Sequence, residues 1–239
     1  MPPGALVLHG FTGTPSSVQG VADALGAGGF EVFLPMLPGH GTSVEDMMTT
    51  GWEDWTAGAE RAFEDLSAAA GPVVVAGLSM GAALGCWLAT RRREIAGLVC
   101  VNPIVEPPAE SFFDMLRGTI AAGVSFIPGP VGSDIARPGV VENAYGGAPL
   151  APMLSLMQGV ADMASQLARI TCPLLLFTSR QDHVVPPSSS DYLAARVTGP
   201  VERVALERSF HVATLDWDAE EIERGTVAFA LRVTSAGTP

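Results

Sequence analysis

The sequence predicts an α/β fold, in which a mainly parallel β-sheet is flanked by helices and carries a small helical cap insertion. Apolar runs that suit buried strands alternate with helix-like segments along most of the 239 residues. The alternation stops between residues 103 and 168, where turns rich in proline and glycine separate apolar helical pieces. We therefore predict a core formed by residues 1–102 and 169–239, with residues 103–168 inserted as a cap.

The first third of the chain contains two strands and two helices. The apolar runs at residues 5–9 and 31–34 predict strands. Ser16 and Ser17 are expected to cap a helix that follows the first strand. A second helix is predicted from apolar residues at helical spacing, which we expect to lie in the core rather than in a ligand site: Trp52, Trp55, Ala59, Phe63 and Leu66.

Four more strands are predicted from apolar runs at residues 72–76, 95–101, 172–178 and 201–206. A helix-like run at residues 82–89 follows the first of them. Within the cap, apolar side chains are concentrated at residues 112–120 and 153–160, and methionine is frequent among them. We expect some of these side chains to line a pocket and others to pack on the sheet.

A candidate nucleophile lies in the pentapeptide Gly77-Leu78-Ser79-Met80-Gly81, between a predicted strand and a predicted helix. A Gly-x-Ser-x-Gly sequence in a strand–turn–helix setting is typical of the nucleophile elbow of α/β-hydrolases. The sharp turn exposes the serine hydroxyl above the sheet. Glycines on either side leave room for the neighbouring backbone, where a Cβ atom would clash.

A nucleophilic serine needs a base, and the base needs a carboxylate to orient it. In this fold the chain order is serine, acid, histidine. Asp182 follows a predicted buried strand and is the acid candidate, and His211 follows the next strand and is the base candidate. His183 is the alternative base, but its place beside Asp182 suits loop packing better. Asp216 and Asp218 come after His211, and we expect them at the start of the last helix.

The residues after the first strand, Gly10 to Pro15, are the candidate oxyanion loop. The backbone N–H groups of Phe11 and Met80 are expected to point at the developing oxyanion. We predict structural roles for the two remaining histidines, with His9 shaping this loop and His40 organising the loop at residues 38–41.

Five segments of the chain resemble the serine α/β-hydrolases of the small bacterial carboxylesterase and monoacylglycerol lipase family. They begin at His9, Leu37, Gly77, Asp182 and Ser209, and they span nearly the whole chain in the family's order. The resemblance implies catalytic Ser79, Asp182 and His211, oxyanion donors at Phe11 and Met80, and a short cap over an acyl pocket.

The composition bears on the partners, cofactors and cellular location that we expect. Hydrophobic residues make up 48% of the chain, but no run is long enough to span a bilayer. The net charge of −12 disfavours nucleic acids and anionic membranes as partners, and no stable membrane insertion is expected. The three dispersed cysteines and four histidines show no disulfide or metal-ligand spacing, so no metal or other cofactor is expected. With no signal peptide recognised, we expect a cytoplasmic monomer or homodimer.

The predicted function is hydrolysis of short- to medium-chain carboxylic monoesters through an acyl-enzyme, with monoacylglycerols among the candidate substrates. The same residues could serve a thioesterase, a lactonase or an acyltransferase, or a ligand receptor with slow turnover. Gly146 and Gly147 offer no side chain to a polar head group. We therefore expect loose selectivity for the alcohol half of the ester.

Overall fold

The computed structural model describes residues 1–129 and 133–235. Six strands form a single sheet in the order β2-β1-β3-β4-β7-β8, and every neighbouring pair in it is parallel. The strands are β1 (Gly4–Leu8), β2 (Glu31–Phe33), β3 (Val73–Leu78), β4 (Gly97–Val101), β7 (Leu174–Ser179) and β8 (Val201–Leu206). All six strands predicted from the sequence are therefore present.

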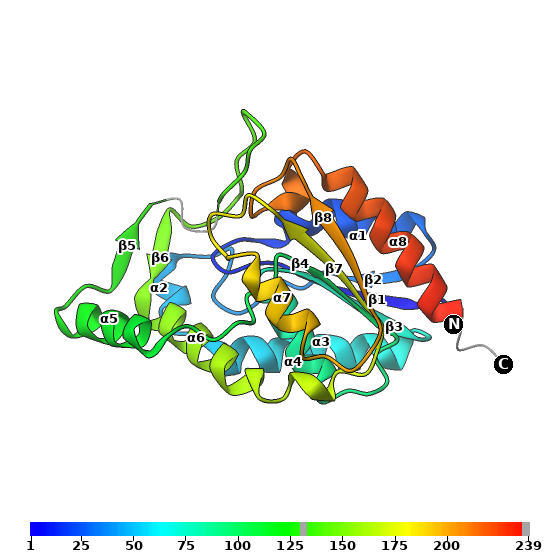
Figure 1. Ribbon diagram of the computed structural model, residues 1–239, viewed down its shortest axis with the longest axis horizontal. Coiled ribbons are helices and arrows are strands. Elements are labelled where there is room, and N and C mark those ends of the chain that lie inside the picture. Colours follow the sequence, from blue (N-terminus) through cyan, green and yellow to red (C-terminus); the bar gives the residue numbers. More distant parts are fainter. Residues whose placement is uncertain (130–132, 236–239) are drawn as a thin grey trace.

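Helices cover both faces of this sheet (Figure 1). One face carries α1 (Gln19–Ala27) and α8 (Ala219–Ser235), and the opposite face carries α3 (Trp52–Ala69) and α4 (Met80–Ala89). The short helices α2 (Val44–Met47) and α7 (Ser188–Ala194) place Met47 and Leu193 in the apolar cluster on the α3 and α4 side. No helix in the described part of the chain is long and apolar enough to cross a membrane.

The strands read as continuous apolar runs because both of their faces are buried. In β1, Leu6 and Leu8 join the cluster beneath α3 and α4, whereas Ala5 and Val7 join the cluster beneath α1 and α8. The tryptophans and other apolar residues of α3 predicted as core are all buried. This two-sided packing fixes the carboxyl ends of the strands, from which the candidate site is built.

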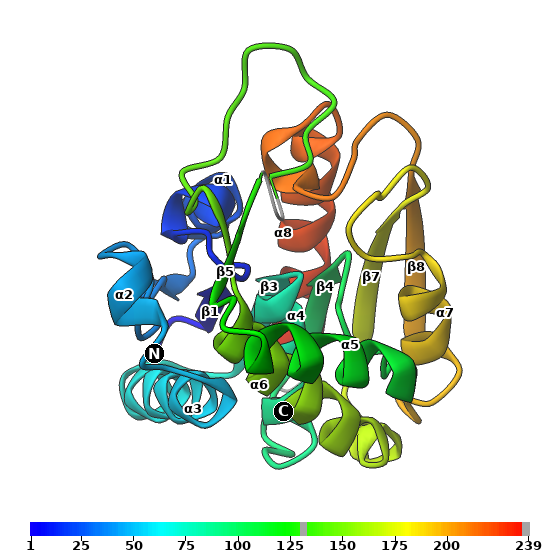
Figure 2. The same ribbon diagram turned by 90° about the vertical axis from the view of Figure 1, so that its left-hand side faces the viewer.

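The described residues between β4 and β7 form an insertion at one end of the sheet (Figure 2). It contains α5 (Glu110–Ala121), β5 (Phe126–Pro128), β6 (Gly147–Pro149) and α6 (Leu150–Ala164), followed by the 3-10 turn η2 (Leu167–Arg169). Helices α5 and α6 coincide with the two apolar pieces recognised in the sequence. The antiparallel pairing of β5 with β6 was not predicted, because strands of three residues are too short to show a periodic pattern.

The predicted serine cap of the first helix is wrong. A 3-10 turn, η1 (Pro15–Val18), precedes α1, and the residue before α1 makes no side-chain cap. Ser16 instead bonds Thr14, with 2.8 Å between the two hydroxyl oxygens. Ser17 donates its hydroxyl to Glu142 of the insertion over 2.6 Å. A contact between residues 125 positions apart thus replaces the local one that the sequence favoured.

Candidate active site

Ser79 lies at the junction between β3 and α4 in a strained backbone conformation. Its φ of 54° and ψ of −113° place it outside the regions that non-glycine residues normally occupy. The turn is held by a 2.9 Å hydrogen bond from the Ser79 N–H to the carbonyl of Val101 on the neighbouring strand. Strain of this kind persists only where the surrounding structure enforces it, which is common at reacting side chains.

The two glycines around Ser79 are required by close backbone contacts. A Cβ atom on Gly77 would lie 2.3 Å from the carbonyl carbon of Gly81. A Cβ atom on Gly81 would lie 2.1 Å from the carbonyl oxygen of Leu8 in β1. Neither contact can be relieved by moving a side chain. The Gly-x-Ser-x-Gly spacing therefore follows from the packing of the elbow against β1 and α4.

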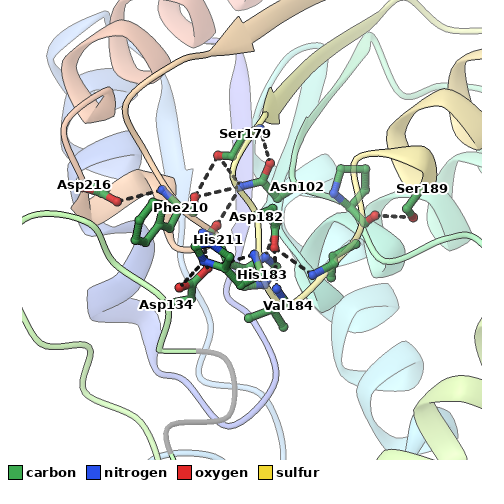
Figure 3. A network of polar contacts seen from close by, with 12 residues as sticks. Asn102, Asp134, Ser179, Asp182, His183, Val184, Ser189, Phe210, His211 and Asp216 are labelled. Atoms are coloured by element: carbon green, nitrogen blue, oxygen red, sulfur yellow. Dashed lines mark hydrogen bonds and ion pairs between the residues drawn. The ribbon is translucent and has the colours of Figure 1, made fainter.

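Asp182 and His211 are joined on the loops after β7 and β8 (Figure 3). The Asp182 Oδ2 atom lies 2.7 Å from Nδ1 of His211. The other carboxylate oxygen of Asp182 accepts the backbone N–H groups of Val184 and Val185 over 2.8 and 2.7 Å. Because the carboxylate accepts the Nδ1 proton, Nε2 of the neutral ring keeps the lone pair that a general base needs.

A cavity of about 250 Å³ brings Ser79 and His211 to a common space. Gly10 and Phe11 from the loop after β1 also line it. A Cβ atom on Gly10 would lie only 3.7 Å from the Cβ atom of Ser79, so this loop runs directly beside the elbow. Met80 is the first residue of α4, and N–H groups in the first turn of a helix have no partner within the helix. Both predicted oxyanion donors therefore border Ser79.

Comparison with known proteins identifies the family of this chain. The model of the alpha/beta hydrolase family matches residues 5–223. This chain belongs to the alpha/beta hydrolase family.

Two curated relatives of this hydrolase align over nearly its whole length. A thermostable monoacylglycerol lipase from Bacillus sp. (strain H-257) is 40% identical over 237 residues, which cover 96% of this chain and 91% of that protein. A carboxylesterase from Bacillus subtilis (strain 168) is 25% identical over 229 residues, covering 94% and 90%. A solved structure from work on two metagenome-derived lipolytic enzymes superposes with a TM-score of 0.91 at 36% identity, covering 96% of this chain and 94% of that one. The predicted fold and family are thereby confirmed.

The other three histidines of the hydrolase have structural partners. His183, the alternative base, is largely exposed and directs its Nδ1 atom to Asp134 over 3.0 Å rather than to Asp182. His9 is fully buried between the carbonyl of Gly10 and the N–H of Leu37. The ring of His40 packs against that of His9, with centroids 4.9 Å apart. These placements match the structural roles predicted for them.

Burial lowers the pKa values of the two packed histidines. The pKa of His9 is lowered from 6.5 to about 3, first by burial and then by the neighbouring His40. Burial lowers the pKa of His40 to about 4, against the opposing effect of its hydrogen bonds to backbone carbonyls. Both rings are therefore neutral at pH 7. In His9, Nε2 accepts the Leu37 N–H, so Nδ1 carries the proton and donates to Gly10.

Insertion side chains form the apolar wall of the hydrolase cavity. Phe112 from α5 contributes to it together with Met153, Leu156 and Met157 from α6. A second cavity of about 380 Å³ adjoins the first, and the two share wall residues that include Ile104, Phe112 and Met157. By contrast, Phe113, Leu116 and Val160 are buried in the packing of the insertion.

Glu142, which was not predicted from the sequence, is the one acidic residue among the described residues that line the active-site cavity. Its Oε1 atom accepts the hydroxyl proton of Ser17, and a Cβ atom on Gly13 would lie 2.8 Å from that same oxygen. Burial raises the pKa of Glu142, while Ser17 and His211 act in the opposite direction. No motif marked this residue, because its partners come from a different part of the chain.

Gly146 and Gly147 do not form the alcohol side of the cavity. Gly147 belongs to β6, where a Cβ atom would lie 2.3 Å from the carbonyl oxygen of Ile127. Gly146 faces open space, with no atom near its potential Cβ position. Loose alcohol selectivity therefore cannot be inferred from these two glycines, since the side chain that borders the cavity close to them in sequence is that of Glu142.

Asn102 is a second residue whose role was not predicted from the sequence. It follows β4 with a φ of 46°, and its side chain is buried. Its amide nitrogen donates to the carbonyl of His211 over 2.7 Å and to Oγ of Ser179 over 2.9 Å. Its amide oxygen accepts the Ser179 N–H over 2.8 Å. Asn102 thus joins the end of β7 to the loop that carries His211.

Asp216 and Asp218 lie just before α8 as predicted, but their carboxylates bind loops rather than helix N–H groups. Asp218 accepts the N–H groups of Arg208 and Ser209, each over 3.0 Å. These bonds and the Arg208 guanidinium lower the pKa of Asp218 in spite of its burial. Asp216 accepts the N–H of Phe210 over 2.9 Å. Both acids therefore shape the loop that carries His211.

Among residues 1–129 and 133–235, no group of three or more histidine, cysteine, aspartate or glutamate side chains is arranged to hold a metal ion.

Proposed function

We propose that this hydrolase cleaves medium-chain monoacylglycerols and related carboxylic monoesters through a serine acyl-enzyme. The proposal depends on one observation: the cavity that contains Ser79 and His211 combines an apolar wall from the insertion with a single buried carboxyl group, that of Glu142. A monoacylglycerol matches both parts of this cavity, because its alkyl chain suits the apolar wall and the hydroxyl groups of its glycerol head can bind the carboxyl group.

In the proposed reaction, the Ser79 hydroxyl attacks the ester carbonyl while His211 Nε2 accepts its proton. Asp182 holds the ring in the required tautomer and stabilises the imidazolium. The N–H groups of Phe11 and Met80 stabilise the negative charge on the carbonyl oxygen. The C–O bond to the alcohol then breaks, and His211 returns its proton to the leaving oxygen. A water molecule activated by the same ring hydrolyses the acyl-enzyme and regenerates Ser79.

The acyl chain is assigned to the side of the cavity formed by the insertion. Phe112, Met153, Leu156 and Met157 present apolar surface there. Methionine side chains adapt to irregular apolar shapes, which suits a flexible alkyl chain. Each methylene group buried against this wall contributes about 0.8 kcal/mol.

The glycerol head is assigned to the side that carries Glu142. A carboxyl group offers about four lone-pair positions, of which Ser17 uses one. A hydrogen bond contributes about 0.5–1.5 kcal/mol net, so two hydrogen bonds between the glycerol head and this carboxyl group correspond to a preference of roughly tenfold over an alkyl alcohol. The 40% identity to a monoacylglycerol lipase over 96% of the chain supports the same substrate class.

The test is a matched series of glyceryl and ethyl esters from acetyl to palmitoyl, assayed with the wild type, Glu142→Ala and Glu110→Gln. Glu110 lies on α5 with an exposed side chain that pairs with Arg117, so its variant is the control. We expect a glyceryl preference of roughly tenfold in the wild type and the control, and its loss in Glu142→Ala. Equal glyceryl and ethyl rates in the wild type would contradict the glycerol assignment.

The same series can include a thioester and a lactone of equal acyl length, which test the alternative chemistries. A single burst of one product equivalent without turnover would instead indicate a ligand receptor. A cytoplasmic location, a monomeric or dimeric state and the absence of nucleic-acid partners remain parts of this proposal that rest on the sequence.

A further inference from the structure

Asp134 of the insertion contacts both loops that carry the proposed acid and base. Its Oδ2 atom accepts the backbone N–H of His183 over 3.1 Å and that of His211 over 3.2 Å. Its Oδ1 atom lies 3.0 Å from Nδ1 of His183. Its backbone carbonyl accepts the N–H of Val212 over 3.0 Å. One residue thus binds the positions that directly follow Asp182 and His211 (Figure 3).

The loop that carries His211 also binds the segment around Asp134. Asp216, which is 1% exposed, accepts the N–H groups of Ala136 and Arg137 over 2.7 and 2.9 Å. The same carboxylate accepts the N–H of Phe210. The segment around Asp134 is therefore fixed on the base loop at two places, one through its own carboxylate and one through that of Asp216.

The backbone of His211 is consequently held from opposite ends of the residue. Asn102 donates to its carbonyl from the sheet, and Asp134 accepts its N–H from the insertion. The Asp182–His211 hydrogen bond joins the loops that follow β7 and β8. The regular pairing of these two strands ends at Ser179 and Leu206, before the loops begin. Loops are more mobile than the elements they connect, so their relative position depends on such cross-links.

We propose that Asp134 is a positioning residue that sets the geometry between the acid and the base, so that the insertion maintains the reaction centre as well as covering the cavity. This inference rests on the proposed serine mechanism. A displacement of about 1 Å in a reacting group can lower the rate by roughly a hundredfold. Loss of the Asp134 carboxylate removes the acceptor of three donor groups, the His183 ring and the backbone N–H groups of His183 and His211. The two backbone N–H groups then need new partners.

Replacing the His183 ring tests whether Asp134 acts through the backbone N–H groups that it binds or through a charge pair with this ring. The ring is 60% exposed and packs edge-on against Phe210, with centroids 4.5 Å apart. His183→Ala removes the ring contact with Asp134 but keeps the backbone N–H groups of residues 183 and 211 that the carboxylate binds. Replacement of the ring should therefore affect the reaction much less than replacement of the carboxylate.

The experiment compares Asp134→Asn, Asp134→Ala, His183→Ala and the control Asp114→Asn. Asp114 is an exposed acid on α5 of the same insertion. Three quantities are measured on each variant: kcat and KM for a p-nitrophenyl ester, the rate at which a fluorophosphonate labels Ser79, and the proton resonance of His211 Nδ1–H. The labelling rate needs a functional serine and base but no natural substrate.

We expect kcat and the labelling rate to fall roughly 10- to 100-fold in Asp134→Ala, with KM changed less than about threefold. Asp134→Asn should lose roughly 3- to 10-fold, because its uncharged amide oxygen can still accept the two backbone N–H groups, but more weakly than the carboxylate does. The His211 Nδ1–H resonance should broaden or shift. His183→Ala should lose less than about fivefold, and the Asp114 control should match the wild type.

An Asp134→Asn protein that folds with unchanged kcat, labelling rate and resonance would overturn the inference, since a purely structural residue would change only the melting temperature. If Asp134→Ala fails to fold, the isosteric Asp134→Asn variant provides the same three measurements. If the wild type labels at Ser79 but hydrolyses no ester, the proposed substrate class fails while the role of Asp134 is still tested by labelling.

Discussion

The carboxylate of Asp182 and the imidazole of His211 are joined by a 2.7 Å hydrogen bond from which water is almost excluded, with side chains 2% and 3% exposed. Asp182 is also fixed by the N–H groups of Val184 and Val185 on its other oxygen. It is therefore restrained on both oxygens before any substrate binds. This arrangement fixes the tautomer of the His211 ring. Replacing the Asp182 carboxylate with an amide should therefore disturb that tautomer.

Asp182→Asn should lower kcat by up to ~10⁴-fold while KM changes little, because the amide favours the wrong tautomer of His211. His211→Ala should be at least as severe. Steady-state kinetics with a p-nitrophenyl ester measures both effects. Should His183→Ala prove to be the inactive variant instead, the assignment of the base to His211 would have to be abandoned.

Ser79→Ala should abolish turnover and labelling by phenylmethylsulfonyl fluoride, because Ser79 is the one serine among residues 1–129 and 133–235 that has a positive φ. The fold should persist, since the elbow is packed closely against the neighbouring backbone at Gly77 and Gly81, and alanine at position 79 leaves these contacts in place. Ser79→Gly should be more stable than Ser79→Ala by about 1 kcal/mol, because glycine adopts a φ of 54° without a Cβ penalty. Chemical unfolding measures this difference. Equal stability of the two variants would show that the elbow is not strained.

Much of the fold and the proposed reaction centre could be predicted from the sequence, because each feature left a local pattern. Strands buried on two faces appear as apolar runs, and the elbow appears as glycines at fixed spacing around Ser79. The order serine, acid, histidine along the chain predicted Asp182 as the acid and His211 as the base. These features depend on contacts within a few residues or on strand succession.

The remaining features depend on contacts between distant segments, which a single sequence does not display. Asp134 lies 77 positions from His211, and Glu142 lies 125 positions from Ser17. Ser17 illustrates the resulting error, since its hydroxyl suited a helix cap locally but binds the insertion instead. Asn102 left one hint, a polar residue before proline at the end of a buried strand. Its two partners could not be inferred from that position.

The buried histidines predict a loss of stability in acid. The unfolded chain binds protons at these rings below about pH 6.5, whereas folded His40, with a pKa of about 4, remains neutral. The stabilising contribution is thus fully present above pH 6.5 and is lost as the pH falls toward 4. Between pH 7 and 5, His40 alone should account for about 2 kcal/mol of lost stability.

The measurement is the free energy of unfolding in urea at pH 7, 6 and 5 for the wild type, His40→Gln and the exposed control His183→Gln. The decline between pH 7 and 5 should be smaller in His40→Gln, because glutamine does not titrate. A decline identical in all three proteins would mean that folded His40 binds a proton as readily as the unfolded chain does.

The two adjoining cavities predict how the enzyme selects acyl chains. As the chain grows from acetyl to about octanoyl, kcat/KM should rise, by up to about fourfold for each methylene group that becomes buried. It should fall for palmitoyl esters once the cavity of about 250 Å³ is filled.

Met157 lies in the wall shared with the cavity of about 380 Å³, so truncating it should connect the two spaces. In Met157→Ala, the optimum should therefore move to chains longer than octanoyl. Met115→Ala, an exposed methionine of the same insertion, is the matched control and should keep the wild-type profile. A series of glyceryl esters at constant alcohol measures all three profiles. A flat wild-type profile, or an optimum that Met157→Ala leaves in place, would show that the acyl chain does not lie against α6.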